Sequence, residues 1–504
     1  MDQLRIKEKY IYCLIIIILL FYFVFQLNFY RHWSSTYDQD LILIHNSLLL
    51  NSGIKAEYHD HPGHTQILLM SIWLNFLDLI NVINASSYDK LNNLNNLEKN
   101  FIDLVKFSRF FNLISSIIIL YAVYNIIKLF YENKGNIYLG IILFICSSPF
   151  INSIKHIRTE LMSSGFIFLT LLYILKAIKK NNLCRKYLIL TGFFFTLSVF
   201  CKFQSVFIFI VFPLLFSIFE KCKKFIVLNE FEVKKLHIYL SIIIIIFISA
   251  IWFKYVKGLN YIILPIFVLF FYFFLNYLNK RFYNNEKFTF IFIFYFVLGI
   301  SISFIILFIL KPFHTNNINM IVNLLGASSM FVKSTNPYSF DIPNIFDLFV
   351  TSYQNLFFYL KNIYFFTKFN EVILLILFSI YAILNYKNNY ITVEYLKILI
   401  ILLFIISIFS VRPVLNYVVY FSPFLTIYFF NVLKNFNRKY IFSFLIFFIF
   451  FNFFHQNNIV IKKKIKFDTN KICNEKLNEK SFFTEKMRTF TEKMRTDIFL
   501  RICK

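Results

Sequence analysis

The sequence predicts an all-α polytopic membrane protein of about thirteen transmembrane helices, with a long first extracytoplasmic loop that carries juxtamembrane helices. Three observations lead to this prediction. Of the 504 residues, 59% are hydrophobic. Apolar runs of about twenty residues, the length of a membrane-spanning helix, recur along the chain. The short loops between these runs are rich in lysine and arginine, as the cytoplasmic loops of membrane proteins are.

The first apolar run, "YIYCLIIIILLFYFVFQLNF", follows Arg5, Lys7 and Lys9. It is longer than the apolar part of a signal peptide, and no small-residue cleavage site follows it. We therefore expect a retained signal anchor whose N-terminus lies in the cytoplasm. The basic loops "KLFYENKGN" and "KAIKKNNLCRK" are then cytoplasmic too. We expect the protein in the inner (plasma) membrane of a bacterium.

Placing the basic loops in the cytoplasm fixes a path of the chain through the membrane, which we call the threading. It makes residues 30–108 one large external loop. An apolar stretch within it, residues 65–83, then lies along the membrane surface, where Asn75 and Asp78 are tolerated. In the alternative, residues 65–83 cross the membrane and every later loop changes side. That alternative places "KAIKKNNLCRK" outside, so the charge bias argues against it.

The rest of the chain divides where its composition changes. Residues 311–369 are rich in proline, asparagine and serine and are expected to form a second external loop. Residues 1–456 are the expected membrane core. Residues 457–504 are a polar, basic tail, which the threading places outside.

Composition also excludes some functions. No aromatic-basic module accompanies the net charge of +26, so no nucleic-acid partner is expected. The nine glycines form no phosphate-cradling loop, which argues against a nucleotide-hydrolysing pump. The seven cysteines show neither C-x-x-C pairing nor the spacing of zinc ligands.

Ionisable and polar residues gather on the side of the membrane that the threading makes external. Some stand in the first external loop, which includes the turn "YHDHPGH", and others at the outer ends of predicted spans. Charged groups at the ends of membrane spans lose part of their hydration, which costs free energy. By default they therefore indicate a functional site. The candidate site residues are Asp38, Asp40, His59, His61, His64, Arg158, Glu160, Lys202, Arg412 and Tyr417.

The residue types in this set favour one kind of chemistry. A carboxylate can act as the general base on an acceptor hydroxyl. Cations at the same interface can hold and neutralise a leaving phosphate. Together they suit the transfer of a group from a lipid phosphate. The turn "HDHPGH" could bind a divalent metal, but its spacing is not diagnostic. We therefore expect no cofactor, with a divalent metal as the alternative.

The order of these motifs resembles the GT-C superfamily of membrane glycosyltransferases, in particular the protein O-mannosyltransferase and lipid A aminoarabinose-transferase type. Those enzymes carry an acidic motif in the first external loop, which is similar to Asp38-Gln39-Asp40 here. Their His-Pro motif is similar to His61-Pro62. Their Arg-x-Asp/Glu motif, at the start of the fourth span, is similar to Arg158-Thr159-Glu160.

Two further motifs extend the resemblance toward the C-terminus. The motif that closes the fifth span of the family is similar to "TGFFFTLSVFCK", which ends at Lys202. An Arg…Tyr…Pro motif near the last spans is similar to Arg412, Tyr417 and Pro423. The family layout of about thirteen spans with a long first external loop also agrees with the threading.

The resemblance implies transfer of a sugar from a polyprenyl-phosphate donor to a lipid, glycan or protein acceptor on the extracytoplasmic face. Asp38 or Asp40 would be the general base. The three cations would contact the lipid-linked phosphate, and the remaining residues would shape the substrate site. The cations are Lys202, Arg158 and Arg412, and the shaping residues are His59, His61, His64, Glu160 and Tyr417.

Two other interpretations remain open. A secondary transporter or lipid flippase predicts broken helices near the midplane and an internal repeat, but the sequence shows no two-half symmetry. An O-antigen-type polymerase or ligase shares the lipid-linked substrates and the cationic external loops. Replacing Asp38 and Asp40 together by asparagine tests the transferase interpretation, because it should abolish a base-dependent reaction.

Overall fold

The computed structural model describes residues 2–25, 38–54, 63–92, 97–130, 134–179, 185–202 and 288–310. It also describes short pieces and single residues within 205–209, 272–276, 419–426 and 443–454, and residue 380. Every regular element among these residues is a helix. The all-α prediction is therefore confirmed for this part of the chain.

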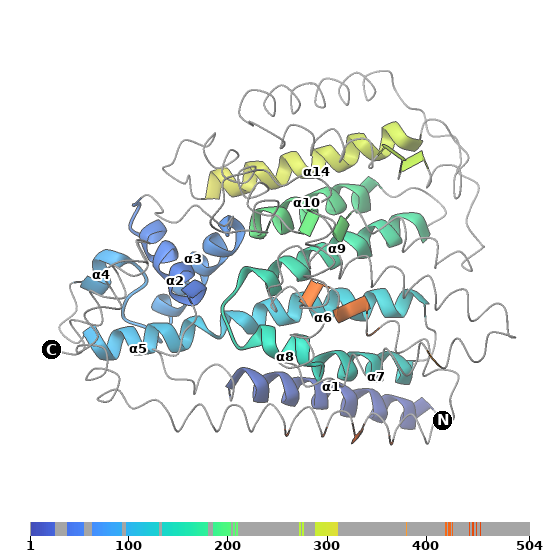
Figure 1. Ribbon diagram of the computed structural model, residues 1–504, viewed down its shortest axis with the longest axis horizontal. Helices are drawn as coiled ribbons and strands as arrows, with labels where there is room; N and C mark the ends of the chain where they lie inside the picture. Colours follow the sequence, from blue (N-terminus) through green and yellow to red (C-terminus); the bar gives the residue numbers. More distant parts are fainter. Residues whose placement is uncertain are drawn as a thin grey trace, which may run out of the picture.

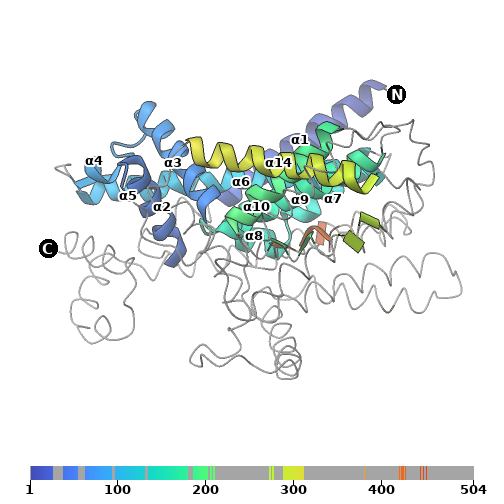
Figure 2. The ribbon, with the colours of Figure 1, turned by 90° about the horizontal axis from the view of Figure 1, so that it is seen from above.

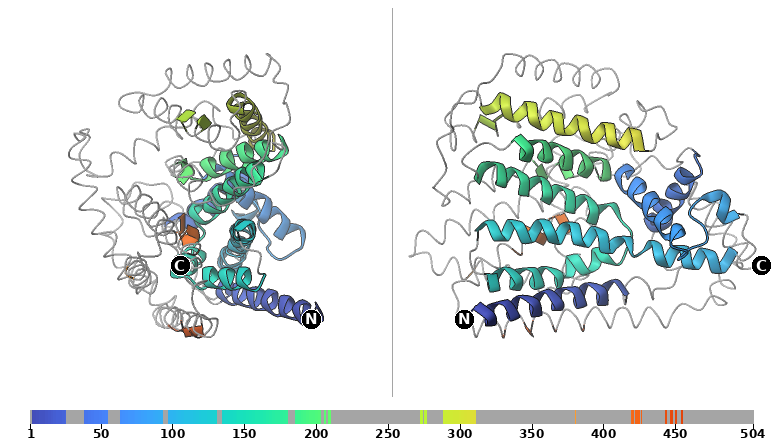
Figure 3. Two further views of the ribbon diagram at one scale, coloured as in Figure 1. Left: turned by 90° about the vertical axis from the view of Figure 1, so that its right-hand side faces the viewer. Right: turned by 180° about the vertical axis from the view of Figure 1, so that it is seen from behind.

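The long apolar helices lie side by side in one row (Figure 1). Figure 3 shows the same row from behind. Each helix packs on its neighbours along the row, so its apolar surface is covered by other helices or faces outward as a lipid-exposed surface would. In order along the row, the helices are α14 (Phe288–Leu310), α10 (Arg185–Cys201), α9 (Thr159–Lys179), α6 (Phe111–Phe130), α8 (Ser148–Ile154) with α7 (Lys134–Ile145), and α1 (Asp2–Val24).

A second group of helices gathers beyond one end of the helices of this row, on the left in Figure 1 (Figures 1 and 2). It consists of α2 (Asp38–Asn51), α3 (His64–Leu79), α4 (Tyr88–Asn92) and α5 (Leu97–Ser108). The N-terminus of α1 lies at the opposite end of the helices, on the right in Figure 1. Lys128 of α6 and Lys176 of α9, which flank the basic loops, lie close enough to each other to interact electrostatically.

Some of the described helices have the character of membrane spans. Lys99–Leu129 and Thr159–Ala177 are each long and apolar enough to cross a bilayer, and Cys13–Val24, Leu41–Asn51 and Ile291–Leu307 are shorter apolar helices. In contrast, α3 is not one of the candidate spans and packs on α2 and on α10. Most of residues 203–287 and 311–456 lie outside the described part, so the count of about thirteen stays a prediction.

The helices α10 and α14 approach each other so closely that glycine is required where they meet. A Cβ atom on Gly192 of α10 would collide with the backbone carbonyl of Phe296. A Cβ atom on Gly299 of α14 would collide with the backbone carbonyl of Ile189. In a membrane, small residues let helix backbones touch, and the resulting van der Waals contact holds the helices together. This contact fixes α10, whose last residue directly precedes Lys202.

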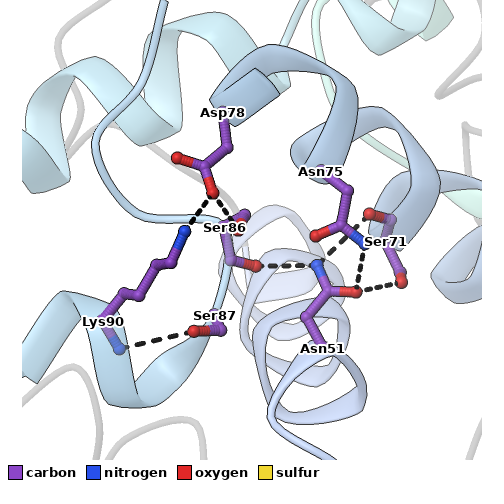
Figure 4. A network of polar contacts seen from close by, with 7 residues as sticks. All are labelled: Asn51, Ser71, Asn75, Asp78, Ser86, Ser87 and Lys90. Atoms are coloured by element: carbon purple, nitrogen blue, oxygen red, sulfur yellow. Dashed lines mark hydrogen bonds and ion pairs between the residues drawn. The ribbon is translucent and has the colours of Figure 1, made fainter. Parts of the chain in front are cut away.

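A polar network ties α2, α3 and α4 together (Figure 4). The Asn51 side-chain amide donates to the carbonyls of Ser86 and Ser71 at 2.7 and 3.2 Å, and its Oδ1 accepts from Ser71 Oγ at 2.5 Å. Asp78 Oδ2 accepts from Ser86 Oγ at 2.5 Å and from Lys90 Nζ at 2.6 Å. Asp78, a charged residue of the otherwise apolar stretch 65–83, is therefore paired by neighbouring side chains.

Candidate active site

The candidate active site lies where the first turn of α3, the start of α9 and the end of α10 meet. Thr65 Oγ1 donates to the carbonyl of Leu197 at 3.1 Å, which joins α3 to α10. The start of α3 also abuts the start of α9, because a Cβ atom on Gly63 would lie 3.3 Å from Thr159 Cγ2. Gly63, which directly precedes His64 at the end of the sequence "YHDHPGH", is thus brought next to Thr159 of the Arg158-Thr159-Glu160 motif.

A buried charge cluster occupies this junction. Glu160 Oε1 lies 3.5 Å from Lys202 Nζ, and both side chains are only 2% exposed. Arg158 Nη1 lies 4.0 Å from the same carboxylate oxygen, and its side chain is 15% exposed. Among the side chains that the structure describes here, two cations share one carboxylate. Buried charges lose their hydration, and cations held in such a place can bind an anionic group of a ligand.

Two serines clamp the helices that carry this cluster. Ser163 Oγ donates to the carbonyl of Ser198 at 3.0 Å, and Ser198 Oγ donates to the carbonyl of Ser163 at 2.7 Å. Glu160 precedes Ser163 by three residues, and Lys202 follows Ser198 by four, so each charge lies about one helical turn from the clamp. The clamp therefore sets the distance between the carboxylate and the ammonium group.

The residues before Arg158 are held by Asn112, which the sequence did not single out. Its side-chain amide donates to the carbonyls of Ile154 and His156, both at 2.8 Å. Asn112 is fully buried, and so is Arg109 one turn earlier in the chain. A polar or charged residue at the start of a predicted span is the signal that could have identified both, since such residues in membrane helices are rarely neutral in function.

The predicted site residue His64 is the first residue of α3 and is 4% exposed. Its ring centroid lies 6.5 Å from that of Phe200, close to the end of α10. The packing of α3 on α10 buries this histidine. His59 and His61, which are also predicted site residues, lie outside the described residues.

Asp38 and Asp40 stand in the first turn of α2. Leu43, three residues after Asp40, contacts the start of α3, because a Cβ atom on Gly63 would lie 3.3 Å from its Cδ2. Ser47 Oγ also donates to the carbonyl of Ile67 at 3.1 Å, which joins α2 to α3. The helix that begins with the acidic motif therefore packs against the start of α3.

A distant part of the sequence also reaches α9. Ser164 Oγ donates to the carbonyl of Val419 at 3.1 Å, and the rings of Phe168 and Phe424 lie 5.0 Å apart. Val419 follows the predicted site residue Tyr417 by two positions. Tyr417 and Arg412 themselves lie outside the described residues, but the chain that follows them packs one turn from Glu160.

The described residues contain no candidate metal site. Among them, no three or more histidine, cysteine, aspartate or glutamate side chains are placed to hold an ion. The side chains at positions 59 to 61 of the turn "HDHPGH" are not among the residues described.

The fold and the site together define an integral, multi-pass membrane protein in which Arg158 and Lys202 approach the buried Glu160 at one end of the helix bundle. Residues 105–253 match the sequence model of the dolichyl-phosphate-mannose-protein mannosyltransferases, a GT-C membrane glycosyltransferase family. The match covers less than half of the chain and confirms the resemblance drawn from the sequence. The family that matches these residues is one of glycosyltransferases that use a polyprenyl-phosphate sugar donor.

The matched segment contains α6 to α10 and, with them, Arg158, Glu160 and Lys202. Searches among curated proteins and among solved structures gave no match.

Proposed function

We propose that the enzyme transfers the sugar, with inversion at its anomeric carbon, to a hydroxyl of a lipid, glycan or protein on the extracytoplasmic face. Asp38 or Asp40 is the general base. The observation that supports this proposal best is the cluster of Arg158, Glu160 and Lys202, in which two cations approach one buried carboxylate.

The charge of the cluster suits the charge that develops in the reaction. A polyprenyl-phosphate sugar is a phosphodiester and carries one negative charge. The polyprenyl phosphate that leaves is a monoester, which carries about −1.5 to −2 at neutral pH. Cations that meet this phosphate therefore bind it more strongly as the glycosidic bond breaks, and such differential binding lowers the barrier.

Each residue of the cluster has a separate role in the proposal. Arg158, the more exposed of the two cations, contacts the phosphate. Lys202 supplies the second positive charge, and Glu160 is a positioning residue that holds its ammonium group. Arg412 is proposed as a third phosphate contact. His59, His61, His64 and Tyr417 are proposed to shape the substrate site.

The bond changes balance in one step. The acceptor oxygen bonds to the anomeric carbon while the bond from that carbon to the phosphate oxygen breaks. The acceptor proton passes to the Asp38 or Asp40 carboxylate, and the electron pair of the broken bond stays on the phosphate. No nucleotide sugar takes part.

The test is a turnover assay on the purified protein in lipid nanodiscs. Radiolabelled polyprenyl-phosphate mannose, glucose and galactose are supplied in turn with an extract of envelope lipids, glycans and proteins as acceptors. Release of free polyprenyl phosphate, lost in the variant with Asp38→Asn and Asp40→Asn, supports the proposal. Asp89→Asn, which alters an exposed aspartate of α4, is the matched control and should keep full activity.

Two results would count against the proposal. Unchanged release in the double variant would exclude these aspartates as the base. No release with any donor, combined with passage of labelled lipid across the bilayer of vesicles, would favour a transporter or flippase.

A further inference from the structure

Three neutral hydrogen-bonding side chains accompany the charge cluster, each from a different element. Gln66, in the first turn of α3, is fully buried, and its backbone amide contacts the sulfur of Cys201. Thr159 directly precedes Glu160 and is 3% exposed. Ser205 is fully buried, and its backbone N–H donates to the carbonyl of Lys202 at 3.1 Å.

The polar atoms of these three side chains are buried without a hydrogen-bond partner among the described residues. Among the described residues, Gln66 Nε2 and Oε1, Thr159 Oγ1 and Ser205 Oγ make no hydrogen bond. Buried polar groups in proteins are nearly always hydrogen-bonded, because a group that has lost its hydration without a partner destabilises the fold. Neighbouring Thr65 and Ser163 follow that rule. Three exceptions beside one charge cluster, among the residues described, therefore mark a place where a ligand can supply the missing hydrogen bonds.

We propose that Gln66, Thr159 and Ser205 bind the hydroxyl groups of the sugar on the donor, while Arg158 and Lys202 bind its phosphate. This inference rests on the proposed function, since it divides that substrate between two sets of side chains.

The chemistry of the two sets supports this division. A carboxamide offers two N–H donors and a carbonyl acceptor, and a serine or threonine hydroxyl both donates and accepts. Sugar hydroxyls need both kinds of partner and carry no charge. The phosphate needs donors and positive charge, which the cations supply.

The position of the three side chains also fits the substrate. Thr159 directly precedes Glu160, and Ser205 follows Lys202 by three residues. The backbone amide of Gln66 contacts Cys201, the residue before Lys202, so all three residues stand beside the ion pair. A sugar is bonded directly to the phosphate, so its hydroxyls must lie within a few ångströms of the phosphate contacts. Because the polar atoms are buried, the first turn of α3 must separate slightly from α9 and α10 when the sugar binds.

Isosteric apolar substitutions separate this role from a structural one. The variants are Gln66→Met, Thr159→Val and Ser205→Ala. If the side chains serve the sugar, each variant should unfold at the wild-type temperature or above, because it removes a buried polar group that has no partner among the described residues. If they serve the fold, the unfolding temperature should fall.

The decisive measurement compares two lipids on the intact protein in nanodiscs. One is the sugar-bearing donor that the wild-type protein turns over in the assay above, and the other is sugar-free polyprenyl phosphate. Each variant should bind the sugar-bearing donor about tenfold more weakly, the effect of losing one or two hydrogen bonds, and the sugar-free lipid unchanged. Lys202→Met should weaken the binding of both lipids.

The control is Thr170→Val, because the Thr170 hydroxyl bonds only within α9, to the carbonyl of Phe166 at 3.0 Å. It should bind both lipids as the wild type does. Equal loss of both lipids, or loss of neither, in the three variants would overturn the inference while the proposed function stands. Failure of the wild-type protein to bind either lipid would instead overturn the proposed function, and this inference with it.

Discussion

Glu160 Oε1 and Lys202 Nζ lie 3.5 Å apart at the junction of α9 and α10, and both side chains are 2% exposed. Arg158 Nη1 lies 4.0 Å from the same oxygen. Each charge in such a buried cluster offsets the hydration that its neighbour has lost. The carboxylate therefore keeps two cations together at the point where a phosphate is proposed to bind.

The unequal charges predict an unequal response to substitution. Glu160→Gln should destabilise the protein by about 3–5 kcal/mol, because it leaves two buried cations without their shared carboxylate. Lys202→Met should cost less, since Arg158 still accompanies Glu160. The measurement is the unfolding temperature of each variant in nanodiscs without substrate, with Lys99→Met, an exposed site on α5, as the control.

The same variants should respond in opposite ways to the product. Polyprenyl phosphate should raise the unfolding temperature of Glu160→Gln by more than that of the wild type, because the remaining cations attract the phosphate more strongly. It should raise that of Lys202→Met by less. An identical rise in all three proteins would show that the cluster does not meet the phosphate.

The serine clamp predicts a link between helix spacing and activity. The variant with Ser163→Ala and Ser198→Ala loses both interhelical hydrogen bonds. We expect a loss of stability of about 1 kcal/mol, the size typical of such bonds in membranes, and a clear loss of sugar transfer because the ion pair is displaced. Thr170→Val serves again as the matched control on α9. Full transfer activity in the double variant would show that the clamp does not position the site.

The glycine contact between α10 and α14 predicts a graded series. Gly192→Ala and Gly299→Ala should strongly destabilise the protein, because the new methyl group meets the backbone of the facing helix. Gly165→Ala should cost less, because its methyl group meets mainly the Ile118 side chain, which can move. Leu298→Ala, at an exposed position of α14, is the control. Unfolding temperatures of the four variants should follow this order, and equal values would contradict the close packing.

The Asp78 carboxylate predicts a dependence of stability on pH. Burial raises the pKa of Asp78. The hydrogen bonds from Lys90 and Ser86 and the Lys90 charge lower it by a larger amount, so the pKa lies below its usual value of 3.8. A carboxyl whose pKa is depressed by folding stabilises the folded state above pH 3.8, and this contribution is lost as the pH falls through the folded-state pKa.

The variant Lys90→Met removes the main cause of the depressed pKa, so its unfolding temperature should change less between pH 6 and pH 3 than that of the wild type. Lys99→Met should behave as the wild type does. The same pH dependence in Lys90→Met as in the wild type would show that the Lys90–Asp78 pair does not contribute.

The candidate site was predictable from the sequence to the extent that its residues are polar groups in apolar surroundings. Arg158, Glu160 and Lys202 stand out because a charge at the end of a membrane span is costly wherever the span lies. Gln66 and Ser205 did not stand out, because an amide or a hydroxyl is common in loops and at helix ends. Their significance depends on burial without a partner, and burial is a property of the folded chain.

The sequence by itself determined that this protein is a helical membrane protein, and it predicted candidate site residues at one end of the spans and basic loops at the other. Both properties are local, since the length of an apolar run and the charges beside it can be counted along the chain. Only the tertiary structure decided that Glu160 pairs with Lys202 and that α10 meets α14 at Gly192. Such pairs depend on which helices are neighbours, and in lipid every apolar helix surface is an equally acceptable partner until backbone shape and polar side chains select one.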